Sequence, residues 1–108
     1  MLPKKNRADK KAVEKIFKEG RFLNSPNLTF KFIKNENSPT PRISFIVPKS
    51  VSKLAVKRNL LRRLGYIVLC KHIKNLPKNI SGVFLFKKYQ DDVSIVENEI
   101  KNILSKIN

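Results

Sequence analysis

Hydrophobic residues recur along this chain with two different periods, and both periods predict regular structure. Residues 28–33 and 42–47 alternate apolar with polar side chains, which is typical of strands that bury one face. Residues 82–86 are almost entirely apolar, which predicts a central strand covered on both faces. Turn-forming residues at 35–41 separate the first two strands, so we expect these strands to pair antiparallel.

Three further segments repeat apolar residues every three or four positions, as amphipathic helices do. The first begins after Asp9, a residue suited to an N-cap, and ends at Gly20. We expect it to bury Val13, Ile16 and Phe17. The last begins at Asp91 or Asp92 and should be a core helix. Its predicted buried residues are Val93, Val96, Ile100, Ile103, Leu104 and Ile107.

The middle helix, predicted from residue 53 onward, combines this apolar period with the densest positive charge in the chain. One broad arc of the helix would hold Leu54, Val56, Leu60, Leu61, Leu64, Ile67 and Val68. The opposite arc would hold Arg58, Asn59, Arg62, Arg63 and Tyr66. Ala55 falls among the polar residues, and its small side chain would let a rigid partner approach while guanidinium groups reach past it. This arrangement predicts a surface that faces RNA.

Length and composition favour one folded domain, residues 1–108, with a nucleic-acid partner. The formal charge is +16, yet 41% of the residues are hydrophobic, which excludes a wholly disordered basic tail. Residues 37–90 contain twelve Lys or Arg and no Asp or Glu. A basic helix can be ordinary solvated surface, but self-repulsion of this kind is better relieved by a polyanion. The acids in residues 91–108 should lie on a helix remote from that partner.

Residues 1–7 predict a flexible basic arm, because they combine positive charge with no apolar period. The charged residues of the arm are Lys4, Lys5 and Arg7. The arm would either order on RNA or serve only to keep the chain in solution.

No set of residues in the sequence predicts unaided catalysis or a metal site in the protein. His72 is the only histidine and Cys70 the only cysteine, so neither a zinc site nor a Cys–His nucleophile is expected. No apolar segment is long enough to span a membrane, and no N-terminal run resembles a signal peptide. With no possible internal disulfide, these features predict a cytoplasmic protein.

Three motifs resemble the family of bacterial ribonuclease P protein subunits, nearly from end to end of the chain. The first helix of that family ends in F-x-x-V-F-x-x-G, where this chain has Val13, Ile16, Phe17 and Gly20. Residues 42–50 are similar to the family's R-x-G-x-x-V-S-K-K motif. Residues 55–66 are similar to A-V-x-R-N-R-x-K-R-x-x-R, which is the most specific of the three.

The resemblance implies an α/β fold of the two-layer α+β type, like domain 2 of ribosomal protein S5. The implied element order is α-β-β(-β)-α-β-α. It also implies a left-handed crossover from a strand through the basic helix to the next strand. The sequence alone would favour a right-handed crossover.

The resemblance further implies that the chain assists a catalytic RNA and has no catalytic residues of its own. In that family the RNA subunit binds Mg²⁺ and cleaves precursor tRNA. The expected partners are therefore the ribonuclease P RNA subunit and precursor tRNA, with no membrane and no obligate protein partner. The expected contacts to the catalytic RNA are Lys49, Lys53, Lys57, Arg58, Asn59, Arg62 and Arg63. The expected cleft for the 5′ leader of the precursor, between the first helix and the sheet, includes Val13, Phe17, Lys31 and Arg42.

The chain departs from the family pattern at several of these positions. Leu60 and Tyr66 replace two arginines of the basic-helix motif, and Val13 and Lys31 fall where aromatic residues are usual. We expect Tyr66 to pack partly in the core and not to stack on a base. Phe17 could stack on leader bases, but its place on the packed side of the first helix favours plain core packing.

Two other classes of protein also carry basic helices. A small ribosomal or other structural RNA-binding protein, with no role in cleavage, remains an alternative because it would be equally basic. A helix-turn-helix DNA-binding protein fits less well, because a β-like run and Pro48 precede the basic helix in place of a helix and a tight turn.

Overall fold

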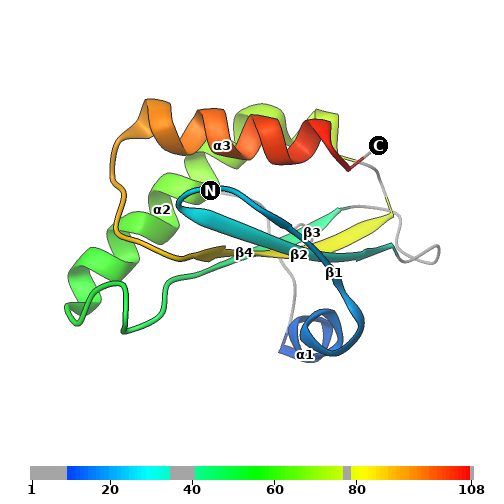
Figure 1. Ribbon diagram of the computed structural model, residues 1–108, viewed down its shortest axis with the longest axis horizontal. Coiled ribbons are helices and arrows are strands. Elements are labelled where there is room, and N and C mark those ends of the chain that lie inside the picture. Colours follow the sequence, from blue (N-terminus) through cyan, green and yellow to red (C-terminus); the bar gives the residue numbers. More distant parts are fainter. Residues whose placement is uncertain (1–9, 35–40, 77–78, 108) are drawn as a thin grey trace.

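The computed structural model describes residues 10–34, 41–76 and 79–107 of the chain (Figure 1). Its elements, in order, are α1 (Lys10–Glu19), β1 (Arg21–Asn24), β2 (Leu28–Lys34), β3 (Arg42–Ile46), α2 (Ala55–His72), the 3-10 helix η2 (Ile73–Asn75), β4 (Ile80–Phe86) and α3 (Val93–Ser105). This is the expected order, with a third strand before the basic helix. The predicted basic arm and the cap at Asp9 lie outside the described residues, as do residues 35–40 of the predicted turn.

The strands form one sheet in the order β1-β2-β4-β3. β2 pairs antiparallel with both β1 and β4, whereas β3 pairs parallel with β4. The predicted antiparallel pairing of the strands at 28–33 and 42–47 is therefore wrong, because β4 lies between them. β4 is buried at almost every position, and burial on both faces requires the central place that its composition predicted.

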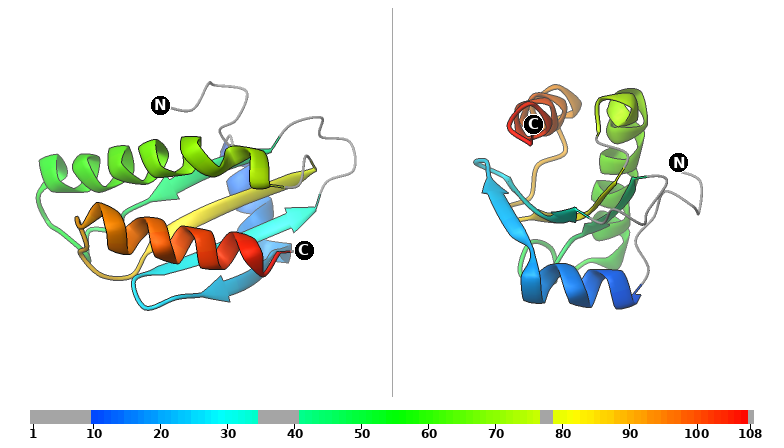
Figure 2. Two further views of the ribbon diagram at one scale, coloured as in Figure 1. Left: turned by 90° about the horizontal axis from the view of Figure 1, so that it is seen from above. Right: turned by 90° about the vertical axis from the view of Figure 1, so that its right-hand side faces the viewer.

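The helices cover both faces of the sheet (Figure 1; Figure 2). α2 and α3 lie side by side on one face, and α1 crosses the other face. The two-layer α+β fold is confirmed, with α1 as a short additional layer. The connection from β3 through α2 to β4 joins parallel neighbours and is left-handed, against the general preference for right-handed crossovers.

Three stacked phenylalanine rings cross the middle of the sheet on the face that α2 and α3 cover. Phe84 on β4 lies opposite both Phe30 on β2 and Phe45 on β3. The ring centroids of Phe30 and Phe84 are 4.3 Å apart, and those of Phe45 and Phe84 are 5.0 Å apart. All three side chains are buried, so this aromatic row joins three strands through one continuous apolar layer.

α2 docks onto the aromatic row at Gly65, where the helix has no side chain to hold it away. A Cβ atom at Gly65 would lie 2.5 Å from the Phe45 ring, so any larger residue would displace a buried ring. Tyr66 packs its ring edge-on against Phe45, with 4.9 Å between centroids, and its hydroxyl oxygen accepts the Phe45 backbone N–H at 3.2 Å. The expectation that Tyr66 packs partly in the core is confirmed.

The buried side of α2 is narrower than the sequence predicted. Leu61, Val68 and Leu69 are buried together with Gly65. Much of the predicted apolar arc is instead exposed, namely Leu54, Val56, Leu60 and Ile67. The reason is that only the sides of α2 that meet the sheet and α3 are removed from water, and the remaining sides stay in contact with solvent.

α3 packs directly against α2. The expectation that its acids lie away from a nucleic-acid partner stays a prediction. The predicted cap is present at Asp92, whose carboxylate accepts the backbone N–H groups of Ser94 at 2.9 Å and Ile95 at 3.2 Å. Val93 is exposed, contrary to the prediction, because side chains of the first turn point back toward the start of the helix. The other predicted core residues are buried: Val96, Ile100, Ile103, Leu104 and Ile107.

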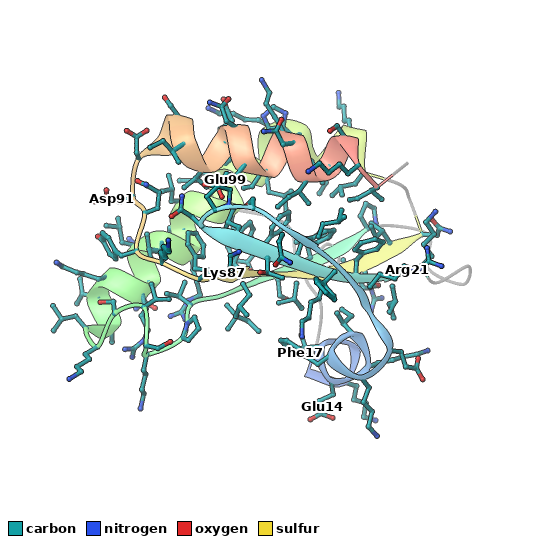
Figure 3. The ribbon with its side chains drawn as sticks, viewed as in Figure 1. Glu14, Phe17, Arg21, Lys87, Asp91 and Glu99 are labelled. Atoms are coloured by element: carbon teal, nitrogen blue, oxygen red, sulfur yellow. The ribbon has the colours of Figure 1, made fainter. Side chains whose placement is uncertain are left out.

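A buried carboxylate, Glu99, ties α3 to the turn between β1 and β2 (Figure 3). Its Oε1 atom accepts the Ser25 hydroxyl at 2.5 Å and the Asn27 backbone N–H at 2.7 Å. Its Oε2 atom accepts the Asn27 side-chain amide at 2.7 Å. Burial acts to raise the pKa of Glu99, but the hydrogen bonds from Ser25 and Asn27 together act more strongly, so the pKa lies below its ordinary value.

Replacing Glu99 with Gln should lower the free energy of unfolding by about 2 kcal/mol near neutral pH, since hydrogen bonds to a charged group contribute about 1.5–3 kcal/mol. Because the folded-state pKa is lowered, the stabilisation is complete above the ordinary carboxyl pKa of 4.5 and is lost as the pH falls through the folded-state pKa. Urea unfolding across this range measures the effect. The wild type and E99Q should differ near neutral pH and converge in acid.

Glu14→Gln provides the control, because Glu14 is an exposed carboxylate on α1 (Figure 3). Its replacement should change the free energy of unfolding by less than about 0.5 kcal/mol at any pH. A deficit in E99Q that stays the same from neutral to acid pH would contradict an ionic role for Glu99.

Candidate nucleic-acid interface

The residues predicted to contact RNA lie together on the N-terminal half of α2 and in the loop before it. We call this group the α2 basic surface, which comprises Lys49, Lys53, Lys57, Arg58, Asn59, Arg62 and Arg63. Arg58 and Arg62 are half-buried, and the others are exposed. The structure therefore gathers the predicted residues at one end of α2 and draws none of them into the core.

Arg58 has a structural role that the sequence did not reveal. Its Nη1 atom donates to the backbone carbonyl oxygens of Ser52 and Lys53, both at 2.9 Å. These bonds hold the preceding loop against the first turn of α2. A guanidinium group carries five N–H donors, so Arg58 can orient this loop and still present donors to a phosphate.

Asn59 positions a second arginine of the α2 basic surface. Its side-chain carbonyl oxygen accepts a hydrogen bond from Nη2 of Arg62, one turn along the helix. This contact limits the orientations open to the Arg62 guanidinium. Nearby, the Nζ atom of Lys57 lies 5.5 Å from the ring centroid of Tyr89, within the range of a cation–π interaction.

The α2 basic surface is not neutralised by carboxylates. Within residues 10–34, 41–76 and 79–107, the one contact within 4 Å between a basic and an acidic side chain joins His72 Nε2 to Glu97 Oε2 at 3.4 Å, at the opposite end of α2. The N-terminus of α2 has no side-chain cap at Leu54, so its first N–H groups and the positive end of the helix dipole add to the local potential. The arrangement suits an anion that carries several phosphates.

The predicted leader-cleft residues lie around the face of the sheet that α1 crosses. Lys31 on β2 and Arg42 at the start of β3 point toward this face, because the adjacent strand residues point into the core. Lys31 is joined to α1, since its Nζ atom lies 4.8 Å from the ring centroid of Phe17. Arg42 is exposed on the opposite edge strand of the sheet, and Val13 is half-buried on α1.

The prediction that the first helix buries three apolar residues is correct only for Ile16, which is fully buried. Phe17 is 42% exposed, so the preference for plain core packing is wrong (Figure 3). The reason is that α1 is one short helix lying across the sheet, and only a narrow line of its side chains meets the strands. Phe17 is therefore available as a surface aromatic residue.

Sequence reasoning missed a second surface aromatic residue, Phe22. It lies on β1, is 62% exposed, and is the cross-strand partner of Lys31. Four residues are too few for alternation to reveal which face of a strand is buried, so the pattern gave no signal here.

The described residues offer groups that can bind phosphates and bases. They contain no cluster of three or more His, Cys, Asp or Glu that could hold a metal ion. Cys70 is a half-buried free thiol, and the His72 imidazole lies against Glu97. The chemistry that the geometry supports is recognition of phosphates by cations and of bases by aromatic rings.

Comparison with known families agrees with the motifs in the sequence. The family model described as Ribonuclease P matches residues 2–108, nearly the whole chain. The chain belongs to the ribonuclease P protein family. A Ribonuclease P protein component from Pseudoalteromonas atlantica is 34% identical to it over 94 residues, which cover 87% of this chain and 75% of that protein. Another, from a Pseudanabaena species, is 28% identical over 109 residues, covering 98% and 94%.

Solved structures of ribonuclease P proteins share the fold. The protein from Thermotoga maritima superposes with a TM-score of 0.82 at 24% identity, covering 94% of this chain and 97% of that one. The protein from Staphylococcus aureus gives a TM-score of 0.81 at 17% identity, covering 93% of each. At these identities the likeness establishes the fold, and it supports the α+β architecture described above.

Family membership makes the chain a component of ribonuclease P, an endoribonuclease of tRNA processing, with an RNA-binding role. The resemblance inferred from three short motifs is thereby confirmed. As for membranes, every helix in the described part of the chain is too short or too polar to cross one.

Replacing Arg58 with Gln should lower the free energy of unfolding by about 1 kcal/mol, because two hydrogen bonds to the loop carbonyls are lost. Arg63→Gln is the matched control: it removes the same charge from an exposed position, so its effect should stay below about 0.5 kcal/mol. Urea unfolding of both variants makes the comparison. Equal stability of the two variants would show that the Arg58 contacts do not stabilise the fold.

Proposed function

We propose that this chain binds the catalytic RNA subunit of ribonuclease P through the α2 basic surface. It also contacts the 5′ leader of precursor tRNA, and in this way it assists the Mg²⁺-dependent endonucleolytic removal of that leader. The observation that carries the proposal is the gathering of lysine and arginine side chains on the N-terminal half of α2 with no carboxylate partner among the described residues.

The α2 basic surface supports RNA binding through both charge and geometry. Arg62 and Arg63 lie on the rigid middle of the helix, which fixes the positions from which their planar forks reach phosphates. Asn59 holds Arg62 from one turn away, and Arg58 fixes the loop that carries Lys53. A phosphate backbone docked here would relieve the repulsion among these cations.

Leader binding is supported by Phe17 and Lys31 on the α1 side of the sheet. The Phe17 ring is 42% exposed, and the Lys31 ammonium lies 4.8 Å from its centroid. Aromatic stacking accepts any base, and a nearby cation pairs with the adjoining phosphate, so the two groups suit single-stranded RNA of varied sequence. Val13 and Arg42 contribute at the margins of this surface in the proposal.

Mg²⁺ belongs, in this proposal, to the RNA partner and the substrate. Hard cations prefer oxygen ligands, and phosphates supply them in abundance. The buried acid of the chain has another role, because Glu99 accepts hydrogen bonds from the β1–β2 turn. The chain therefore helps to position precursor tRNA on the catalytic RNA, because its cations reduce the repulsion between these two polyanions. It does so in the cytoplasm and without a further protein partner.

Adding the protein to the cognate catalytic RNA should raise the rate of precursor tRNA cleavage at low Mg²⁺. The gain should shrink as Mg²⁺ rises, because divalent ions screen the same phosphates. Single-turnover cleavage with and without the protein measures this. A structural RNA-binding protein of the ribosomal kind would bind the RNA without any gain in cleavage, and that outcome would overturn the proposal.

Replacing Arg62 and Arg63 together with Gln should flatten the dependence of log K on log salt by about 1.5 units, because each neutralised phosphate contributes about 0.7–0.9. Titrating binding to the catalytic RNA at several salt concentrations measures the slope. The matched control removes two exposed cations near the C-terminus, Lys101 on α3 and Lys106 just after it, through Lys101→Gln and Lys106→Gln, and should change the slope less. If both double variants shift the slope equally, only net charge matters and the α2 basic surface is not the interface.

A further inference from the structure

Phe22 exposes more of its surface than any other aromatic residue in the described ranges. It is 62% exposed, against 42% for Phe17 and 37% for Tyr89. Burial of apolar surface stabilises a fold, so the part of Phe22 that stays in water adds nothing to the stability of the core. A single exposed phenylalanine is not unusual, so the meaning of Phe22 depends on what lies beside it.

Register places Phe22 directly beside the cation already assigned to the leader-binding surface. Leu23 packs against the core, so Phe22 points to the opposite face of the sheet, where α1 lies. Its cross-strand partner is Lys31, and side chains at such positions are within contact range on one face. The Nζ atom of Lys31 lies 4.8 Å from the Phe17 ring centroid, so Lys31 contacts Phe17 and is also the cross-strand neighbour of Phe22.

The three residues come from three different elements and form one surface. Phe17 comes from α1, Phe22 from the edge strand β1 and Lys31 from β2. Single-stranded RNA presents flat base faces separated by phosphates. Two exposed aromatic rings and one cation on neighbouring elements offer matching groups, and stacking on the rings needs no particular base.

We propose that Phe22 is a positioning residue that extends the leader-binding surface to the edge of the sheet. A nucleobase of the 5′ leader stacks on Phe22, a second nucleobase stacks on Phe17, and the intervening phosphate contacts Lys31. The inference rests on the proposed function and adds to it a specific residue at the edge of the sheet.

Two other occupants of this surface are less compatible with the chain. A second copy of the chain would bring another net charge of +16 to a surface that already carries Lys31. A protein strand added to the edge strand β1 would pair through backbone groups. Any contact that it made with the Phe22 side chain would be the same for precursor and mature tRNA. Both alternatives predict effects that do not depend on the leader.

The test uses the holoenzyme, assembled from the full chain and the catalytic RNA, with precursor tRNAs whose leaders lengthen from a single nucleotide. Phe22→Ala should weaken binding of long-leader precursors about five-fold or more, the low end of what one stacked base contributes. Binding of mature tRNA and of the shortest precursor should be unchanged. Phe22→Tyr should retain wild-type affinity, because the stacking face is kept.

Val93→Ala is the matched control, since Val93 is an exposed apolar residue on α3, across the sheet from this surface. It should leave the affinity for every substrate unchanged. A leader in which abasic nucleotides replace the bases should bind the wild type and F22A equally. Urea unfolding of F22A and the wild type should coincide, because Phe22 lies outside the core.

The outcomes separate the inference from the proposed function. If the wild-type holoenzyme binds precursor and mature tRNA equally, leader binding by the chain is wrong and the role of Phe22 falls with it. If the wild type prefers the precursor but F22A keeps the full preference at every leader length, only the inference about Phe22 is overturned. A loss in F22A that is equal for mature and precursor tRNA would point instead to a protein contact or a folding defect.

Discussion

The stacked row of Phe30, Phe84 and Phe45 is the interaction on which the rest of the structure depends. It lies across β2, β4 and β3, so it joins an antiparallel and a parallel pair of strands in one apolar layer. α2 also packs against this row, since Gly65 lets the helix backbone approach the Phe45 ring closely. The position of the basic helix therefore depends on the interior of the sheet.

This docking allows a strongly charged helix to be stable. The cations of the α2 basic surface repel one another and have no carboxylate partners among the described residues, which opposes folding. Burial of Leu61, Val68 and Leu69 offsets that repulsion. Arg58 adds local order by holding the loop carbonyls of the α2 N-terminus. The repulsion among these cations therefore stays unrelieved within the described part of the chain.

The two faces of the sheet serve different ends. On the side of α3, Glu99 fastens the turn between β1 and β2, and the apolar residues of two helices close the core. On the side of α1, the strands carry Lys31 and Phe22 at half-buried and exposed positions beside Phe17. The first side fixes where the strands lie, and the second side uses their fixed spacing to present aromatic rings and a cation. The spacing of side chains on the exposed face of the sheet is therefore set by the packing on its other face.

The sequence by itself determined the helices and longer strands, the cap at Asp92, the central place of β4 and the family. Periodicity, capping and motif spacing are local properties, so they can be seen without tertiary contacts. Only the tertiary structure decided that β4 separates β2 from β3, that Phe17 is exposed, and that Arg58 binds its own loop. Strand pairing and exposure depend on which distant residues meet, and a helical period alone does not show which part of an apolar arc is covered.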